Sequence, residues 1–292
     1  MKVTIIGTGL IGGSMALDLK KRRFASQVIG VDNNTTHLAK SLELGIIDEA
    51  MELEEAVPES DLVIVATPVD SIPATLQKVL DQVSPEAVVL DVGSIKEKIC
   101  QAADQHPNRA QFVACHPIAG TEYSGPEAAH YYLFDGKINI ITDASRSKQE
   151  SLDVVNKVFD TLKMNTIHMD AHEHDRHIAY VSHLSHITSF TLGLTVLDIE
   201  KDEESIFNMA GSGFASTVRL AKSSPDMWTP IFHENSKNLV KAIDAYVDKL
   251  KHFKKMIEEK DQKGTHRAIQ ASNEIERILD GIALKDKEAT LK

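Results

Sequence analysis

His116 has the sequence context of a general base. It follows the apolar run Phe112–Ala114 at the end of an expected strand, and Pro117 and Gly120 then lead into a small-residue turn. A histidine suits proton transfer near neutral pH because its reference pKa is about 6.5, and it must be neutral to accept the proton. A lone histidine is more often a hydrogen-bonded core residue. Ser94, just after the preceding apolar run, can reach the same space and favours the catalytic interpretation.

Cys115 neighbours His116 in sequence, but the two are not expected to form a nucleophile–base pair. Adjacent side chains of a strand point to opposite faces of the sheet. Cys100 and Cys115 are the only cysteines, too few for a disulfide framework. We therefore expect Cys115 to pack as a small buried residue of the strand.

Gly7, Gly9 and Gly12 have the spacing of a dinucleotide-binding loop. They come directly after the apolar run Val3–Ile6 and precede a helical stretch over Ser14–Lys21. The first glycine of this pattern permits a tight turn, and the second lets the backbone approach a pyrophosphate at a positive helix end. The third allows close packing of helix against strand. Alone, the three glycines are a weak signal.

Asp32 makes a cofactor the better interpretation of this loop. It follows Gly12 by twenty residues at the end of the run Val28–Val31, where a carboxylate can accept hydrogen bonds from ribose hydroxyls. Asn33 and Asn34 come next and offer no cation for a 2′-phosphate, so NAD is favoured over NADP. The residues expected to bind the cofactor are Gly7, Gly9, Leu10, Ile11, Gly12, Asp32, Thr67 and Pro68.

The elements that must position these residues alternate as in a parallel α/β sheet. Short apolar runs are separated by amphipathic stretches or turns, and each run ends in a chemically useful residue. Ligands of open α/β sheets bind beyond the carboxyl ends of the strands, so these residues should converge on one cleft. The expected strands are Val3–Ile6, Val28–Val31, Leu62–Ala66, Val88–Leu90, Phe112–Ala114, Ile138–Ile141 and Asn165–His168, with a helix over Ser147–Leu162.

Beyond Asp170 the apolar spacing becomes helical throughout. We therefore expect an α/β, Rossmann-type dinucleotide-binding domain over residues 1–170, an all-α substrate and dimerisation domain over residues 171–283, and a frayed tail over residues 284–292. An apolar stripe from Phe232 to Ile257 has an approximate 4-3 spacing, typical of both a core helix and a dimer seam. We favour a homodimer formed through the helical domain.

The composition argues against several classes of partner. The chain has 292 residues, 42% of them hydrophobic, and a net charge of -11, which disfavours binding to nucleic acid or to an anionic membrane. No apolar run approaches the roughly 18 residues of a membrane helix, and no signal-peptide pattern precedes the first strand, so a cytoplasmic protein is expected. The same charge would repel an anionic substrate, so such a ligand needs local cations.

The second domain contributes histidines and an arginine. His183 and His186 are three residues apart and share a helix face. This density of histidines suggests zinc, but no H-E-x-x-H pattern occurs and neither cysteine lies nearby, so no metal is expected. Arg219 could be a solvated surface charge, yet an arginine can also hold a carboxylate through two hydrogen bonds.

Taken together, these segments resemble the prephenate dehydrogenase family of tyrosine biosynthesis. The resemblance spans almost the whole chain, and its more specific elements are His-Pro-Ile-Ala-Gly-Thr-Glu from His116 and Ser-His-Leu-x-His from Ser182. It implies NAD-dependent oxidative decarboxylation of prephenate to 4-hydroxyphenylpyruvate. Hydride would pass from ring C4 to NAD while His116 accepts the C4 hydroxyl proton, and loss of CO2 from C1 would aromatise the ring.

The resemblance also implies roles for other residues. Ser94 matches a serine that hydrogen-bonds the same hydroxyl and orients His116, and Arg219 matches an arginine that binds a substrate carboxylate. Three further matches surround the substrate pocket: His186 lines it, and Thr121 and Glu122 border it, with Glu122 in a charged gate. Trp228 is expected to complete the pocket across a dimer interface.

One segment departs from the family. The family commonly carries Gly-Phe-Arg-Asp, whereas this chain has Gly213-Phe214-Ala215-Ser216, which puts the gating ion pairs and any tyrosine feedback in doubt. Ser185 also stands where proline is usual. The alternatives are an arogenate dehydrogenase, with the same chemistry on the transaminated side chain, and a non-catalytic NAD-binding regulatory module. The β-hydroxyacid dehydrogenases usually rely on a lysine in the helical domain, where this chain is rich in histidine.

Overall fold

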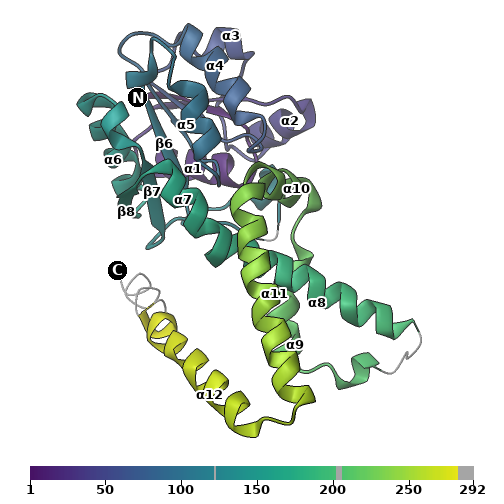
Figure 1. The fold of residues 1–292 in the computed structure, drawn as a ribbon. Helices are drawn as coiled ribbons and strands as arrows, with labels where there is room; N and C mark the ends of the chain where they lie inside the picture. The colour runs from purple at the N-terminus through teal and green to yellow at the C-terminus, as the bar shows by residue number, and fades with distance from the viewer. Residues whose placement is uncertain (122, 202–205, 282–292) are drawn as a thin grey trace.

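The computed structural model describes residues 1–121, 123–201 and 206–281 (Figure 1). Its first part is an eight-stranded sheet in the order β3-β2-β1-β4-β5-β6-β7-β8. The strands are β1 (Lys2–Ile6), β2 (Gln27–Val31), β3 (Glu49–Ala50), β4 (Leu62–Val65), β5 (Val88–Asp91), β6 (Phe112–Pro117), β7 (Ile138–Thr142) and β8 (Asn165–Met169). The order reverses between β1 and β4, which is where a doubly wound sheet opens a crevice for a dinucleotide.

Helices cover both faces of this sheet. The core on one face includes residues of α4 and α5, and the core on the other includes residues of α1 and α6. Helices on both faces bury the central strands β4 and β5 along their whole length, whereas no residue of the edge strand β8 is fully buried. The helices of this part are α1 (Leu10–Lys21), α2 (Thr35–Glu43), α3 (Leu53–Ala56), α4 (Ile72–Gln82), α5 (Glu97–Ala103) and α6 (Gln149–Thr161).

The structure differs from the sequence-based expectation in three places. Strand β7 runs antiparallel to β6, although all strands were expected to be parallel. A parallel return needs a crossover, usually a helix, and the described residues between β6 and β7 contain only the 3-10 turn Pro126–Ala128. The two-residue strand β3 was not predicted. Helix α1 begins at Leu10 rather than Ser14, so Gly12 lies inside the helix.

The second part of the chain is helical. Helix α7 (Ala171–Ile178) begins two residues after β8 and continues through a π-helical turn, Ala179–His183, into α8 (Leu184–Glu200), which leads away from the sheet (Figure 1). The remaining helices are α9 (Ser212–Val218), α10 (Pro225–Glu234), α11 (Ser236–Glu258) and α12 (Gln262–Ser272). Helix α10 packs back on the sheet domain, because Trp228 and Ile231 belong to the same buried cluster as residues of β4 and α4.

The apolar stripe of the second domain is largely exposed. Leu239 is buried, but Val240, Leu250 and Ile257 on the same helix, α11, are each more than half exposed. Within the described residues, no helix is both long enough and apolar enough to cross a membrane. The predicted tail over residues 284–292 lies outside the described part of the chain.

Candidate functional site

His116 lies near the end of β6 and is almost completely buried. Its neighbours Ala114 and Cys115 belong to the cores on opposite faces of the sheet, so the imidazole shares the face of Ala114, where α5 and α7 pack. There, His116 Nδ1 lies 2.8 Å from Nε2 of His174, the fourth residue of α7. The predicted base therefore makes its ring contact with the second domain.

The hydrogen bonds around His174 assign the proton positions. His174 Nδ1 lies 2.8 Å from Asp175 Oδ1, and this carboxylate also accepts the backbone N–H groups of Lys96 at 2.7 Å and Glu97 at 2.9 Å. A carboxylate only accepts, so His174 carries its proton on Nδ1 and its Nε2 accepts from His116 Nδ1–H. Neutral His116 is thereby left with a lone pair on Nε2, the atom that a base needs.

The electrostatic surroundings keep His116 neutral. Burial lowers the pKa of His116 well below its usual value of 6.5, and the Coulombic effects of His174, Lys96 and His183 lower it further. Burial also lowers the pKa of His174, although its hydrogen bond to Asp175 acts in the opposite direction. His116 is therefore in the base form at neutral pH.

A buried ion pair not singled out from the sequence lies directly behind the base. Lys96 is completely buried; its ammonium pairs with the Asp91 carboxylate and donates to the carbonyl oxygen of Cys115 at 2.6 Å. Asp91 Oδ1 accepts the N–H of the same Cys115 at 3.2 Å. The only sequence signal was position, since Asp91 ends β5 and Lys96 follows Ser94 by two residues.

The π-helical turn brings a second histidine to this face. His183 follows His174 by nine residues, and at about 100° per residue an unbroken α-helix would place the two on opposite sides. The extra residue of a π-turn rotates the following helix back by about 100°. His183 then lies within roughly a quarter turn of His174 around the helix axis. The amide of Asn235 completes the arrangement, with Nδ2 3.3 Å from His183 Nδ1 and 2.7 Å from the Asp175 carbonyl oxygen.

His183 and His186 converge on Trp228, as their predicted common face allows. The His186 ring stacks on the indole with centroids 3.5 Å apart, and the His183 ring meets it edge-on at 5.9 Å. Burial lowers the pKa of His183 to about 4 and also lowers that of His186, to which nearby Arg219 adds. Trp228 packs against histidines of its own chain because α10 docks on the sheet domain, and its expected role across a dimer interface stays a prediction.

Within the described part of the chain, the remaining predicted substrate and catalytic residues are not hydrogen-bonded to the buried histidines. Arg219 is exposed at the start of the 3-10 turn Arg219–Lys222, and Thr121 is exposed with Oγ1 accepting the Tyr123 N–H at 3.2 Å. Ser94 is half-buried in the turn after β5, and no hydrogen bond among the described residues joins it to His116. Glu122 lies outside the described residues.

The glycine loop has the geometry that a dinucleotide needs. Gly7 has φ of +95°, and a Cβ there would lie 2.5 Å from the Ala66 carbonyl oxygen. A Cβ on Gly12 would lie 2.1 Å from the Gly7 carbonyl oxygen, whereas one on Gly9 would meet nothing within 4 Å. Gly9 is also the N-cap of α1 and offers no side-chain cap, so the first N–H groups of the helix remain available to a phosphate.

Asp32 is held in place by two backbone N–H groups. Its Oδ2 accepts the N–H of Thr8 from the glycine loop at 2.9 Å, and its Oδ1 accepts the N–H of Asn34 at 2.9 Å. The other predicted cofactor residues lie on the same edge of the sheet, with Leu10 and Ile11 in the first turn of α1 and Thr67 and Pro68 directly after β4. These residues fit the two ends of a dinucleotide.

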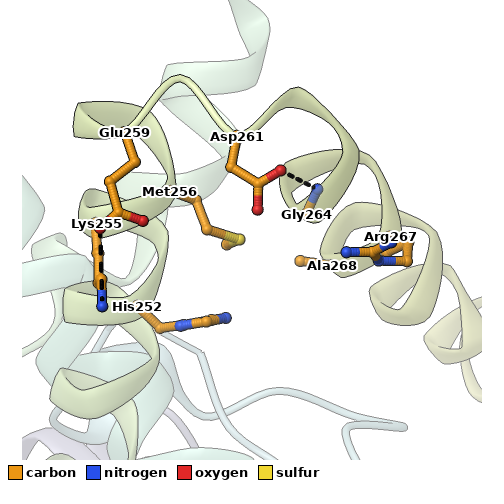
Figure 2. A pocket seen from close by; sticks show the side chains of 8 residues that line it. All are labelled: His252, Lys255, Met256, Glu259, Asp261, Gly264, Arg267 and Ala268. Atoms are coloured by element: carbon orange, nitrogen blue, oxygen red, sulfur yellow. Dashed lines mark hydrogen bonds and ion pairs between the residues drawn. The ribbon is translucent and has the colours of Figure 1, made fainter.

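The site is recognised by its side-chain chemistry rather than by a large hollow. A hollow of about 410 Å³ lies instead at the turn between α11 and α12 (Figure 2). It is lined by His252, Lys255, Met256, Glu259, Asp261, Gly264, Arg267 and Ala268, none of which was predicted to act in catalysis. In the described ranges, no three His, Cys, Asp or Glu side chains are grouped as metal ligands would be.

Comparison with known proteins relates this arrangement to one family. The family model "Prephenate dehydrogenase, nucleotide-binding domain" matches residues 15–168, and "Prephenate dehydrogenase, dimerization domain" matches residues 170–271. The chain is similar to the prephenate dehydrogenase of Bacillus subtilis, with 31% identity over 99% of this chain and 78% of that protein.

Two solved structures extend the similarity to the fold. One is prephenate dehydrogenase from A. aeolicus in complex with hydroxyphenyl propionate and NAD+, with a TM-score of 0.87, 33% identity and coverage of 95% of this chain and 97% of that chain. The other is Synechocystis arogenate dehydrogenase, with a TM-score of 0.79, 30% identity and coverage of 96% and 100%.

Two alanine substitutions in the glycine loop should have different effects. Gly9→Ala meets open space, so we expect an unchanged melting temperature without ligand but NAD affinity weakened by about tenfold or more, because the methyl group would occupy the path of the pyrophosphate. Gly12→Ala forces a clash with the Gly7 carbonyl and should cost about 1–3 kcal/mol of stability. Calorimetric titration and thermal melts measure both effects. Equal NAD affinity of Gly9→Ala and the parent would contradict the assignment of the loop.

Proposed function

The chain belongs to the prephenate dehydrogenase family of NAD-dependent oxidoreductases, and on this basis we propose that it converts prephenate to 4-hydroxyphenylpyruvate by oxidative decarboxylation. The observation that carries the proposal is the unprotonated Nε2 of His116, on a strand end beside the carboxyl edge where the glycine loop lies. We further propose that residues 1–170 bind the dinucleotide and residues 171–283 supply substrate contacts and the dimer interface.

The proton chemistry follows from the hydrogen bonds of His116. NAD, when bound, supplies the hydride acceptor. His116 Nε2 takes the proton of the substrate's ring hydroxyl as hydride leaves the same carbon, and it returns that proton to the phenol oxygen after CO2 has departed. The imidazolium formed in between is stabilised through His174 by the Asp175 carboxylate, and a positioned base of this kind contributes about 10²–10⁴-fold to a rate.

The substrate is a dianion, and the proposed pocket offers it a cation and neutral donors. The charge of Arg219 helps to lower the pKa of His186, so the guanidinium acts electrostatically on the ring stack. Trp228 Nε1 is buried and has no hydrogen-bond partner among the described residues, so a substrate oxygen would satisfy it. In this proposal Arg219 binds a carboxylate, Ser94 orients the hydroxyl, and His186, Trp228, Thr121 and Glu122 surround the ligand.

A second copy of the chain is the proposed protein partner. The exposed apolar side chains of the helical domain include Leu194 on α8, Leu250 on α11 and Ile269 on α12, and all three lie within the matched dimerization domain. A homodimer would remove these surfaces from water.

The purified protein with NAD should form NADH from prephenate, and replacing His116 by Asn should lower kcat by about 10²–10⁴-fold while NAD affinity stays within about twofold. The pKa of His116 is lowered well below 6.5, so the neutral base persists as pH falls through 6.5 and kcat/KM should remain flat there. An acid limb at or above pH 6.5, or normal turnover by His116→Asn, would contradict the role of His116 as the base.

The same assay with arogenate in place of prephenate tests the alternative substrate. Turnover of arogenate alone would make the chain an arogenate dehydrogenase.

Arg219→Ala should act mainly on KM. Losing a charged hydrogen bond costs about 1.5–3 kcal/mol, which corresponds to a rise in KM of about 10-fold to 150-fold with kcat little changed. Lys222→Ala removes a cation from the same 3-10 turn and serves as the matched control, with KM expected to stay within about twofold. Equal KM values for the two variants would exclude the carboxylate role of Arg219.

Leu250→Glu should disrupt the dimer. A carboxylate in the centre of an apolar interface is left unpaired on association, so sedimentation should shift from twice the chain mass toward the single-chain mass. Leu42→Glu on α2, an exposed leucine of the first domain, is the control and should sediment as the parent does. A parent protein that sediments as a monomer would refute the proposed interface.

A further inference from the structure

Strand β6 extends beyond the strand that supports it. The pairing of β5 with β6 ends at Asp91 opposite Ala114, whereas β6 continues through Cys115 and His116 to Pro117. On the other side β6 is still paired, since His116 lies opposite Ile140 of β7. On the β5 side, therefore, the backbone immediately before the base has lost its strand neighbour.

Two side chains take the place of the missing strand. Asp91 Oδ1 accepts the backbone N–H of Cys115 at 3.2 Å, and Lys96 Nζ donates to its carbonyl oxygen at 2.6 Å. The ammonium and the carboxylate also pair with each other, and Asp91 Oδ2 accepts the N–H of Gly93 at 2.8 Å. Both hydrogen-bonding groups of the residue that precedes His116 are thus held by this pair.

Stability alone is a poor explanation for the pair. Lys96 and Asp91 are both completely buried, and the desolvation of two buried charges commonly cancels their attraction. Apolar residues of similar volume would often stabilise a protein equally well or better at such a position. What an apolar pair could not do is hydrogen-bond both the N–H and the C=O of Cys115.

The same segment also holds the far end of the histidine relay. The backbone N–H groups of Lys96 and Glu97 donate to the two oxygens of Asp175, which orients His174, which in turn accepts from His116. Lys96 therefore supports His116 indirectly from two directions, with its side chain bound to the Cys115 carbonyl of β6 and its own backbone N–H bound to the Asp175 carboxylate of α7.

We propose that Lys96 and Asp91 are positioning residues for the base: together they replace the missing end of β5, fix the peptide that carries His116, and set its ring against His174. This proposal rests on the proposed role of His116. Lys96 has a second, electrostatic effect, because its charge is one of those that oppose protonation of the imidazole. The other groups that face the base are His174 and Asp175 from α7, His183 from the π-turn, and Asp91.

Lys96→Met tests both effects. We expect a folded protein whose kcat falls at least about tenfold while KM changes less than about threefold, because the ligand contacts remain and the base is displaced. Removing the ammonium should also raise the pKa of His116 and move the acid limb of kcat/KM to higher pH. A merely structural lysine would lower the melting temperature without moving this limb. Wild-type kcat and an unmoved limb in folded Lys96→Met would overturn the proposal.

Two further variants keep the test decisive. Asp91→Asn combined with Lys96→Met removes both charges, so it avoids an unpaired buried carboxylate and should still lose kcat about tenfold or more. Wild-type kcat in this double variant would overturn the proposal, and so would failure of both variants to fold, since the pair would then be a folding requirement. Lys20→Met, which breaks the surface pair with Asp48, is the matched control and should keep the parent kcat.

Histidine NMR separates this proposal from the proposed function. In ¹⁵N-histidine-labelled protein, with the His116 signals assigned by their loss in His116→Asn, the free protein should show His116 protonated on Nδ1, and Lys96→Met should shift its titration upward or mix its tautomers. This measurement needs no substrate. If the parent turned over neither prephenate nor arogenate, the altered His116 signals would still support the positioning role; unchanged signals would refute it whatever the substrate.

Discussion

The hydrogen bond between His116 Nδ1 and His174 Nε2 is the contact on which the rest of the site depends. It joins β6 of the sheet to α7 of the helical domain, so the proposed base has its ring partner only when the two parts are packed together. It also has a direction, because Asp175 accepts from the other nitrogen of His174 and leaves only one arrangement of protons. That arrangement exposes a lone pair on His116 Nε2, the atom on which the proposed reaction depends.

Burial keeps the histidines of this relay neutral, and it also requires each nearby charge to be paired. His116, His174 and His183 are each almost completely buried, which lowers the pKa of all three and keeps them neutral. In such surroundings every charge needs a partner. Lys96 and Asp91 satisfy each other, and Asp175 receives two backbone N–H groups in addition to His174. Arg219, by contrast, remains exposed, which is compatible with its proposed role of binding an anionic ligand in a protein of net charge -11.

A π-turn between α7 and α8 determines which histidines of the helical domain reach the candidate site. The π-turn Ala179–His183 rotates α8 relative to α7, so that His183 reaches the face of His174 and His186 stacks on Trp228. Trp228 is drawn into the site of its own chain because α10 packs on the same buried cluster as β4 and α4. The far side of α11 keeps its apolar residues exposed, which leaves that surface to the proposed second copy.

The sequence by itself determined the local elements and the kind of chemistry. Alternating apolar runs indicate the major strands, the spacing from Gly7 to Asp32 indicates a dinucleotide loop, and His116 at a strand end indicates a base, because these depend on neighbours in the chain. Only the tertiary structure decided the antiparallel direction of β7, the π-turn, the burial of Lys96 and the pairing of His116 with a histidine 58 residues away. Those features depend on which segments pack together, since a hydrogen-bond partner on a distant helix leaves no periodicity in the sequence.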